Sequence, residues 1–330
     1  MNRKSIGVIG GGSWGTAIVK MLCENTTNIY WWIRNKTILD HIKSHGHNPK
    51  YISDAEINIS KINLTNDINE CVENSDIIIL AIPSLYLDQA LQKITSPINK
   101  KIIFSAIKGI VPETNSIVGD YIKNKFNVDY ENIGVITGPC HAEEVALERL
   151  SYLTISCSNQ DHSLLVAKSL SSRYIKTMIS DDIFGTEYAA VLKNVIAIAS
   201  GISHGLGYGD NYQAVLVSNA IREISRFVDV AHPIKRDINE SAYLGDLLVT
   251  AYSQFSRNRT FGEMIARGYS VKSTLLEIKM IAEGYYAVKC IHLLNEKHNV
   301  FMPINNAVYN ILYNGISAKK EMEKLSNILN

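Results

Sequence analysis

The pattern of apolar and polar positions changes once along the chain, near residue 185. Before that point, short runs of continuously apolar residues alternate with amphipathic segments of helical spacing. Continuous apolar runs are typical of strands covered on both faces, and their alternation with helices predicts a parallel α/β sheet. The predicted strands are SIGVI (5–9), NIYWWI (28–33), DIIILAI (76–82), KIIFSA (101–106), NIGVIT (132–137), YLTISC (152–157) and RYIKTM (173–178).

The second half of the chain reads as helical throughout. Apolar residues recur at helical spacing in 187–200, 211–228, 241–254, 273–298 and 304–314, and this period predicts helices. A chain of 330 residues also exceeds the size at which one hydrophobic core usually stops growing. The expected fold class is therefore a Rossmann-type doubly wound α/β sheet followed by an all-α domain, with domains over 1–183 and 184–330.

A glycine-rich turn joins the first predicted strand to the first predicted helix. Gly10, Gly12 and Gly15 form a GxGxxG pattern, whose glycines allow a tight turn, close approach of a pyrophosphate and close packing of helix on strand. The strand before it and the helix after it predict a dinucleotide site in domain 1–183. Trp14 fits two interpretations, packing on the first helix or a wall beside the dinucleotide.

The residue after the second strand bears on the choice of cofactor. An acidic residue there binds the ribose 2′-hydroxyl of NAD, but this chain has Arg34, with Lys36 nearby. A guanidinium can accept the 2′-phosphate of NADP or stack on adenine. A solvated arginine at a strand end is the alternative, so both NAD and NADP stay open.

Two polar segments follow later strands of the predicted sheet, where open α/β sheets place their ligands. Lys108 follows the fourth run, and Gly138 opens the turn GPCHAEEV after the fifth. The start of a helix in that turn would offer free N–H groups to an anion. Cys140 beside His141 suggests a nucleophile and base, but sequence neighbours rarely face each other, and we do not favour that interpretation.

The helical half carries three further polar candidates. Lys193 and Asn194 interrupt an otherwise apolar helix, and a buried lysine is rare, although a lysine whose stem lies on the core is the alternative. Close to Lys108, a desolvated Lys193 would have a lowered pKa useful for acid–base catalysis. Asp246 and the run SRNR (256–259) follow; the arginines could grip a phosphate, or the run could be a loop that ends a helix.

Composition excludes several classes of function. The formal net charge of +1 gives no long-range field for nucleic acid or an anionic membrane. The five scattered cysteines lack the spacing of disulfide frameworks and zinc sites, so we expect no metal and a reducing cytoplasm. We read neither a signal peptide nor an apolar stretch long enough to cross a membrane.

Taken together, these segments resemble the bacterial-type NAD(P)-dependent glycerol-3-phosphate dehydrogenases. The resemblance covers nearly the whole chain. It is carried by GGGSWGTA (10–17), Lys108-Gly109, GPCHAEEV (138–145), LKNVIAIASGI (192–202), GDLLVTAYSQFSRNR (245–259) and IAEG (281–284). It implies a Rossmann domain, an α-helical substrate domain, a cytoplasmic and usually dimeric enzyme, and interconversion of dihydroxyacetone phosphate and sn-glycerol 3-phosphate for phospholipid synthesis.

The resemblance also implies roles for individual residues. The residues implied to contact the dinucleotide are Ser13, Trp14, Arg34, Lys108, Ala142, Arg257, Ile281 and Glu283. The residues implied to line the substrate site are Lys108, Gly138, Cys140, Lys193, Asp246, Ser256, Arg257 and Asn258. Lys193 would be the proton donor and acceptor, Lys108 would add positive charge beside the reacting oxygen, and Asp246 would orient Lys193 or hold a hydroxyl. Cys140 departs from the serine or threonine common in the family, and a thiol is a weaker hydrogen-bond donor.

Two other functions remain as alternatives. A β-hydroxyacid dehydrogenase of the 6-phosphogluconate type also has a Rossmann domain, a helical domain and a catalytic lysine. Its substrates need a carboxylate-binding site, which the segments SRNR (256–259) and GDL (245–247) do not suggest. A non-catalytic dinucleotide sensor is the other alternative. It has no need of an acid–base lysine.

Overall fold

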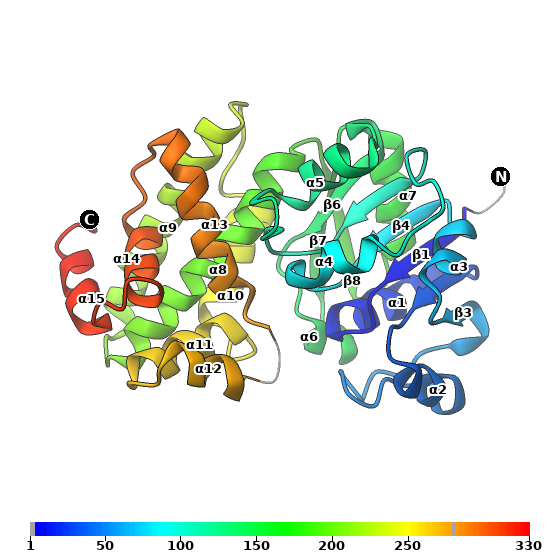
Figure 1. Ribbon diagram of the computed structural model, residues 1–330, viewed down its shortest axis with the longest axis horizontal. Coiled ribbons are helices and arrows are strands. Elements are labelled where there is room, and N and C mark those ends of the chain that lie inside the picture. The colour runs from blue at the N-terminus through cyan, green and yellow to red at the C-terminus, as the bar shows by residue number, and fades with distance from the viewer. Residues whose placement is uncertain (1–3, 279–280) are drawn as a thin grey trace. The chain divides into compact units, whose positions relative to one another are not determined.

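The computed structural model describes residues 4–278 and 281–330, which form two compact units (Figure 1). Unit 1 comprises the described residues up to Ile107 together with Val118–Ile183. Unit 2 comprises Lys108–Ile117 and the described residues of Phe184–Asn330. The chain therefore passes briefly into unit 2 at Lys108, before unit 1 is complete.

Unit 1 is built on one sheet of eight strands in the part of the chain that is described. The strands are β1 (Ile6–Ile9), β2 (Ile29–Trp32), β3 (Ile62–Thr65), β4 (Ile77–Leu80), β5 (Ile102–Ser105), β6 (Ile133–Thr137), β7 (Ser151–Cys157) and β8 (Ile175–Ser180). Their order is β3-β2-β1-β4-β5-β6-β7-β8. β1 lies in register between β2 and β4, with Ile6 opposite both Ile29 and Ile77. The order reverses between β1 and β4, which is where open α/β sheets bind ligands.

The sheet confirms the Rossmann-type fold class and corrects two details of the expectation. β3 was not predicted, because INLT is an edge strand with only Thr65 buried and lacks the continuous apolar run of an inner strand. β7 runs antiparallel to β6, whereas a parallel sheet was expected. A strand buried on both faces is apolar whichever way it runs, so the pattern could not give its direction.

The helices of unit 1 pack on the sheet and on one another. They are α1 (Ser13–Asn25), α2 (Lys36–His45), α3 (Ile68–Glu73), α4 (Leu87–Leu91), α5 (Val118–Phe126), α6 (Ala142–Ala146) and α7 (Gln160–Leu170), with 3₁₀ turns η1 (Ile59–Lys61), η2 (Ser84–Tyr86) and η3 (Tyr130–Asn132). α1 contacts both α6 and α7, and α7 also lies on β7 and β8. The apolar faces of α1 and α7 share one buried core with the strands.

The described residues of Phe184–Asn330 have helices as their regular secondary structure, and the segment Lys108–Ile117 of unit 2 has one isolated β-bridge, between Val111 and Ser116. The helices of unit 2 are α8 (Ile183–Gly205), α9 (Asp210–Ala231), the π-helical turn η4 (Ser241–Gly245), α10 (Asp246–Tyr252), α11 (Arg257–Ala266), α12 (Val271–Glu277), α13 (Glu283–His298), α14 (Pro303–Leu312) and α15 (Ala318–Ser326). The all-helical expectation is confirmed, but α11 and α15 were not predicted. Part of the helix predicted over 273–298 falls on residues 279–280, which lie outside the described residues.

Helix α8 is the core of unit 2 and is longer than the predicted 187–200. By length and composition it could cross a membrane, but 94% of its apolar 18-residue segment is buried inside the protein. Within the described residues it is the one helix with this property. Its apolar residues belong to a core shared with α9, α10, α11, α13 and α14, so its hydrophobicity is explained by packing.

Glycines let the backbones of α8, α11 and α13 approach closely. A Cβ on Gly201 of α8 would lie 1.9 Å from the carbonyl oxygen of Arg259 in α11. A Cβ on Gly262 of α11 would lie 2.1 Å from the carbonyl oxygen of Ile198. On α13, a Cβ at Gly284 would lie 2.5 Å from the carbonyl oxygen of Asn194. Larger side chains at these positions would push the three helices apart.

We therefore predict that Gly262→Ala destabilises the protein. The added Cβ must displace the α8 backbone, and overpacking of this kind costs about 1–3 kcal/mol or more in the free energy of unfolding. Urea denaturation measures this loss. Gly209→Ala, where a Cβ would meet nothing within 4 Å, is the control and should lose less. Equal stabilities of the two variants would contradict the close approach.

Candidate active site

The three glycines of the first turn each have a different environment. Gly10 has φ +140°, and a Cβ there would lie 2.2 Å from the carbonyl oxygen of Ala81, just beyond β4. A Cβ on Gly15 would lie 2.1 Å from the carbonyl oxygen of Gly10. A Cβ on Gly12 would meet nothing within 4 Å, so this glycine faces open space. The turn is thus tight on the protein side and accessible at Gly12, which fits a bound pyrophosphate.

The start of α1 is also suited to an anion. Gly12 is the N-cap and has no side chain that could cap the helix, and the N-terminal end of a helix attracts negative charge. Asn48, which is buried, donates from Nδ2 to the carbonyl oxygen of Gly11 at 3.1 Å and to Oγ1 of Thr16 at 2.9 Å. Asn48 therefore stabilises the glycine turn through these two hydrogen bonds. Nothing in the local sequence pattern distinguishes this residue.

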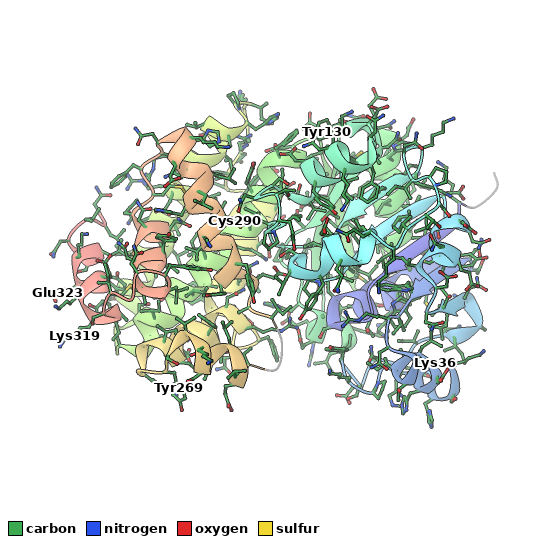
Figure 2. The ribbon with its side chains drawn as sticks, viewed as in Figure 1. Lys36, Tyr130, Tyr269, Cys290, Lys319 and Glu323 are labelled. Atoms are coloured by element: carbon green, nitrogen blue, oxygen red, sulfur yellow. The ribbon has the colours of Figure 1, made fainter. Side chains whose placement is uncertain are left out.

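Other residues implied at the dinucleotide lie around this turn in unit 1. Ser13 is buried at the start of α1, and Trp14 is half-buried and packs against the core of unit 1. Arg34 is exposed after β2, with its guanidinium carbon 5.7 Å from the ring centroid of Tyr86. Lys36 begins α2 and is exposed (Figure 2). Two cations thus lie near the end of β2.

The turn after β6 forms as the sequence predicts. Gly138 has φ +106°, and a Cβ there would lie 2.8 Å from the carbonyl oxygen of Tyr152. His141 is the N-cap of α6, which begins at Ala142. Cys140 and Ala142 are only 6% and 7% exposed, so a reacting molecule would have little access to the thiol.

Unit 2 brings together three charged side chains from separate segments. Lys193, on α8, donates from Nζ to Oδ1 of Asp246. Lys108 places its Nζ 3.6 Å from Oδ2 of the same carboxylate. The side chains of Lys193 and Asp246 are 5% and 1% exposed, and that of Lys108 is 19% exposed. One buried carboxylate is therefore shared by two ammonium groups.

This arrangement changes the protonation of Lys193. Burial, the largest effect, lowers the pKa of Lys193 to about 7; Asp246 opposes the shift and Lys108 adds to it. A lysine with such a pKa exchanges protons near neutral pH. Within the described part of the chain, Oδ2 of Asp246 is buried and accepts no hydrogen bond, so it can accept one from a ligand. The site can therefore move a proton and hold a hydroxyl group.

A chain of amide hydrogen bonds supports these three groups. Asn194 donates from Nδ2 to the carbonyl oxygen of Lys108 at 2.6 Å. Its Oδ1 accepts from Nδ2 of Asn258 at 3.0 Å, and Oδ1 of Asn258 accepts from the N–H of Gly284 at 3.0 Å. Asn194 was only noted beside Lys193 in the sequence and was not assigned to the site. Its position on a nearly all-apolar helix was the available signal, because a buried amide needs partners.

The SRNR run begins a helix, which corrects the interpretation that it ends one. Ser256 is the N-cap of α11 and accepts from the N–H of Arg259 at 3.3 Å. Ser256 and Asn258 are buried, and Arg257 is half-buried. Ile281 lies in the loop before α13, and Glu283 is the first residue of that helix. All five belong to unit 2, as do Lys108, Lys193 and Asp246.

Comparison with known proteins identifies the family. The family model for the NAD-dependent glycerol-3-phosphate dehydrogenase N-terminus matches residues 5–163, and the model for its C-terminus matches residues 182–323. The chain belongs to this family. Two relatives named glycerol-3-phosphate dehydrogenase [NAD(P)+] come from Staphylococcus epidermidis (33% identical, covering 98% of this chain and 97% of the relative) and from an Exiguobacterium species (35%, covering 97% and 94%).

Solved structures in the family have the same fold. A glycerol-3-phosphate dehydrogenase from Coxiella burnetii is similar with a TM-score of 0.89 and 26% identity, and each chain covers 98% of the other. A D-mandelate dehydrogenase, at 17% identity, has a TM-score of 0.59 with 98% of this chain and 99% of that chain covered, and shows a likeness of fold alone. The family dehydrogenase is therefore far more similar to this chain than a dehydrogenase of hydroxy acids.

The environment of Lys193 predicts the effect of Asp246→Asn. Asp246 favours the protonated ammonium, so replacing its charge should lower the pKa of Lys193 further, and more of the amine should be neutral at pH 7. We expect faster labelling of Lys193 by an amine-reactive reagent, followed by mass spectrometry across a pH series. The exposed Lys272 is the internal control. Slower labelling of Lys193 in the variant would contradict the electrostatic account.

Proposed function

We propose that this protein is an NAD(P)-dependent glycerol-3-phosphate dehydrogenase, which interconverts dihydroxyacetone phosphate and sn-glycerol 3-phosphate for glycerophospholipid synthesis. The observation that carries the proposal is the buried Lys193–Asp246–Lys108 cluster in a member of this family. A reduction of a ketone needs a group that protonates the new alkoxide, and a lysine with a pKa near 7 suits this task.

The glycine turn supports the choice of cofactor. Gly10, Gly12 and Gly15 fit a bound pyrophosphate, and Ser13, Trp14, Arg34, Ala142, Arg257, Ile281 and Glu283 are the further residues we assign to the dinucleotide, with Lys108. The bound dinucleotide supplies the hydride. Arg34 and Lys36 are compatible with the 2′-phosphate of NADP, and we leave the preference between NAD and NADP to the assay below.

The substrate would be held and protonated by residues of both segments of unit 2. Lys193 gives its proton to the oxygen on C2, while Lys108 stabilises the negative charge that develops on that oxygen. Oδ2 of Asp246 accepts a hydroxyl of the substrate, and its other oxygen keeps Lys193 in place. Arg257, with Ser256 and Asn258, grips the phosphate, and this positioning contributes to catalysis. Gly138 and Cys140, in unit 1, are the remaining residues that the family resemblance assigns to the substrate.

We also propose a role for each domain, an oligomeric state and a cellular compartment. Residues 1–183 would serve as the dinucleotide-binding domain and 184–330 as the substrate domain, within a homodimer that acts in the cytoplasm. None of the five cysteines is in a disulfide bond, and all five are buried, which is compatible with a reducing compartment. Size-exclusion chromatography with light scattering tests the homodimer directly.

One assay tests the reaction, the substrate and the cofactor together. Loss of reduced-nicotinamide absorbance is followed with dihydroxyacetone phosphate, once with NADH and once with NADPH. We expect turnover with at least one of them. A hydroxy-acid substrate panel is the comparison: turnover confined to that panel would favour the β-hydroxyacid alternative. Cofactor binding without any oxidation would favour a sensor.

Replacement of the acid–base group should separate chemistry from binding. For Lys193→Ala we expect turnover to fall by a factor of about 10²–10⁴, while cofactor affinity stays within about twofold. Steady-state kinetics and fluorescence titration with the reduced cofactor measure the two effects. Lys272→Ala, at an exposed lysine, should behave as wild type. Near-normal turnover of Lys193→Ala would refute its assignment.

Replacement of Arg257, the proposed phosphate-binding residue, should mainly weaken substrate binding. Charge-assisted hydrogen bonds are worth about 1.5–3 kcal/mol, so Arg257→Ala should raise KM for dihydroxyacetone phosphate at least about tenfold. Arg267→Ala is the matched control, because that exposed arginine lies just after the same helix. If KM is unchanged in Arg257→Ala, another residue holds the phosphate.

A further inference from the structure

Three histidines meet at the end of α2 in unit 1, and none of them is among the residues assigned to the reaction. The Nε2 atoms of His41 and His47 are 3.2 Å apart. The ring of His45 stacks on that of His41, with centroids 4.2 Å apart and planes inclined by 16°. His41 and His47 are half-buried and His45 is exposed. Imidazoles this close together need a physical explanation, because protonated rings would repel one another.

Backbone hydrogen bonds orient two of the three rings. Nδ1 of His47 lies 3.2 Å from the carbonyl oxygen of His45, and Nδ1 of His45 lies 3.1 Å from the carbonyl oxygen of His41. A carbonyl oxygen only accepts, so the proton of each neutral ring is on Nδ1 and the lone pair is on Nε2. Metal-binding histidines are oriented in this way, with the other ring nitrogen donating to a backbone carbonyl.

The separation of the two Nε2 atoms also fits a chelate. Two nitrogens that bind one ion tetrahedrally at 2.0–2.1 Å stand about 3.3 Å apart. We propose that His41 and His47 bind one divalent transition-metal ion of the zinc, nickel and copper group through their Nε2 atoms. Imidazole suits these ions. In the metal-free protein, His41 donates from Nε2 to the lone pair of His47; when the ion binds, His41 holds its proton on Nδ1 instead, through exchange with solvent, and its Nε2 lone pair binds the ion.

The surroundings of the pair define what kind of site it is. Within residues 4–278 and 281–330, no three His, Cys, Asp or Glu side chains are arranged to hold one ion, so the site is a two-histidine chelate with positions left to water. Desolvation and the neighbouring rings of His45 and His47 lower the pKa of His41.

The site is coupled to the glycine turn through the next residue. His47 precedes Asn48, whose amide holds the carbonyl oxygen of Gly11 and the hydroxyl of Thr16. An ion on His41 and His47 would tie α2 to this segment. Metal binding is therefore expected to stabilise unit 1 against unfolding, since a ligand that binds only the folded state stabilises it.

Titration of the untagged protein with Zn²⁺ and Ni²⁺, followed by calorimetry at pH 7.5, tests the proposal. We expect one saturable site per chain. His41→Ala and His47→Ala should each weaken metal binding at least about tenfold. The metal affinity of the double variant should be no lower than that of the weaker-binding single variant, because each change destroys the same chelate.

Two controls keep the result specific. His162 is the matched control, because its Nδ1 lies 2.9 Å from a backbone carbonyl oxygen but it lacks the chelate geometry; His162→Ala should bind as wild type. The thermal shift caused by Zn²⁺ should be lost in His41→Ala and kept in His162→Ala. Equal affinity in wild type and His41→Ala, or the absence of a saturable site in wild type, would overturn the proposal. Neither outcome would bear on the dehydrogenase reaction, which uses none of these histidines.

Discussion

The burial of one ammonium group is the constraint on which the site depends. Lys193 is almost fully removed from water and has one carboxylate, Asp246, that it shares with Lys108. Burial of a charge without a full partner is costly, and the usual result is a shifted pKa. The site therefore holds a proton that it can release near neutral pH. With both lysines protonated, these three groups also carry a net positive charge, which suits an anionic substrate.

The architecture of unit 2 maintains that constraint. α8 can bury Lys193 because it is packed on nearly every side, and glycines on α8, α11 and α13 allow the necessary close approach. The same packing brings the amides of Asn194 and Asn258 into contact with each other and with the backbone at Lys108 and Gly284. Asp246 follows a π-helical turn, a feature often found at functional sites. Stability and chemistry thus depend on the same contacts.

Much of this could be predicted from local sequence pattern. Continuous apolar runs predicted the inner strands, and the helical spacing of apolar residues after residue 185 predicted the helical half. The GxGxxG pattern between a strand and a helix predicted the glycine turn. Each of these patterns reflects a local requirement of the backbone. The edge strand β3 could not be predicted because few of its residues are buried. The antiparallel direction of β7 could not be predicted because the apolar pattern of a strand buried on both faces is the same in either direction. Asn48 was not identified, and Asn194 was named without a role, because their partners are distant in sequence and a hydrogen-bond network exists only in the folded chain.

The pH dependence of turnover in both directions tests the central claim most directly. In the mechanism that we propose, reduction of the ketone uses the protonated form of Lys193, and oxidation of the alcohol uses the neutral form. Burial lowers the pKa of this lysine to about 7, so kcat for reduction should fall as the pH rises through about 7, and kcat for oxidation should rise over the same interval. Profiles that are flat from pH 6 to 9 in both directions, or a change near the ordinary lysine pKa of about 10.4, would contradict the account.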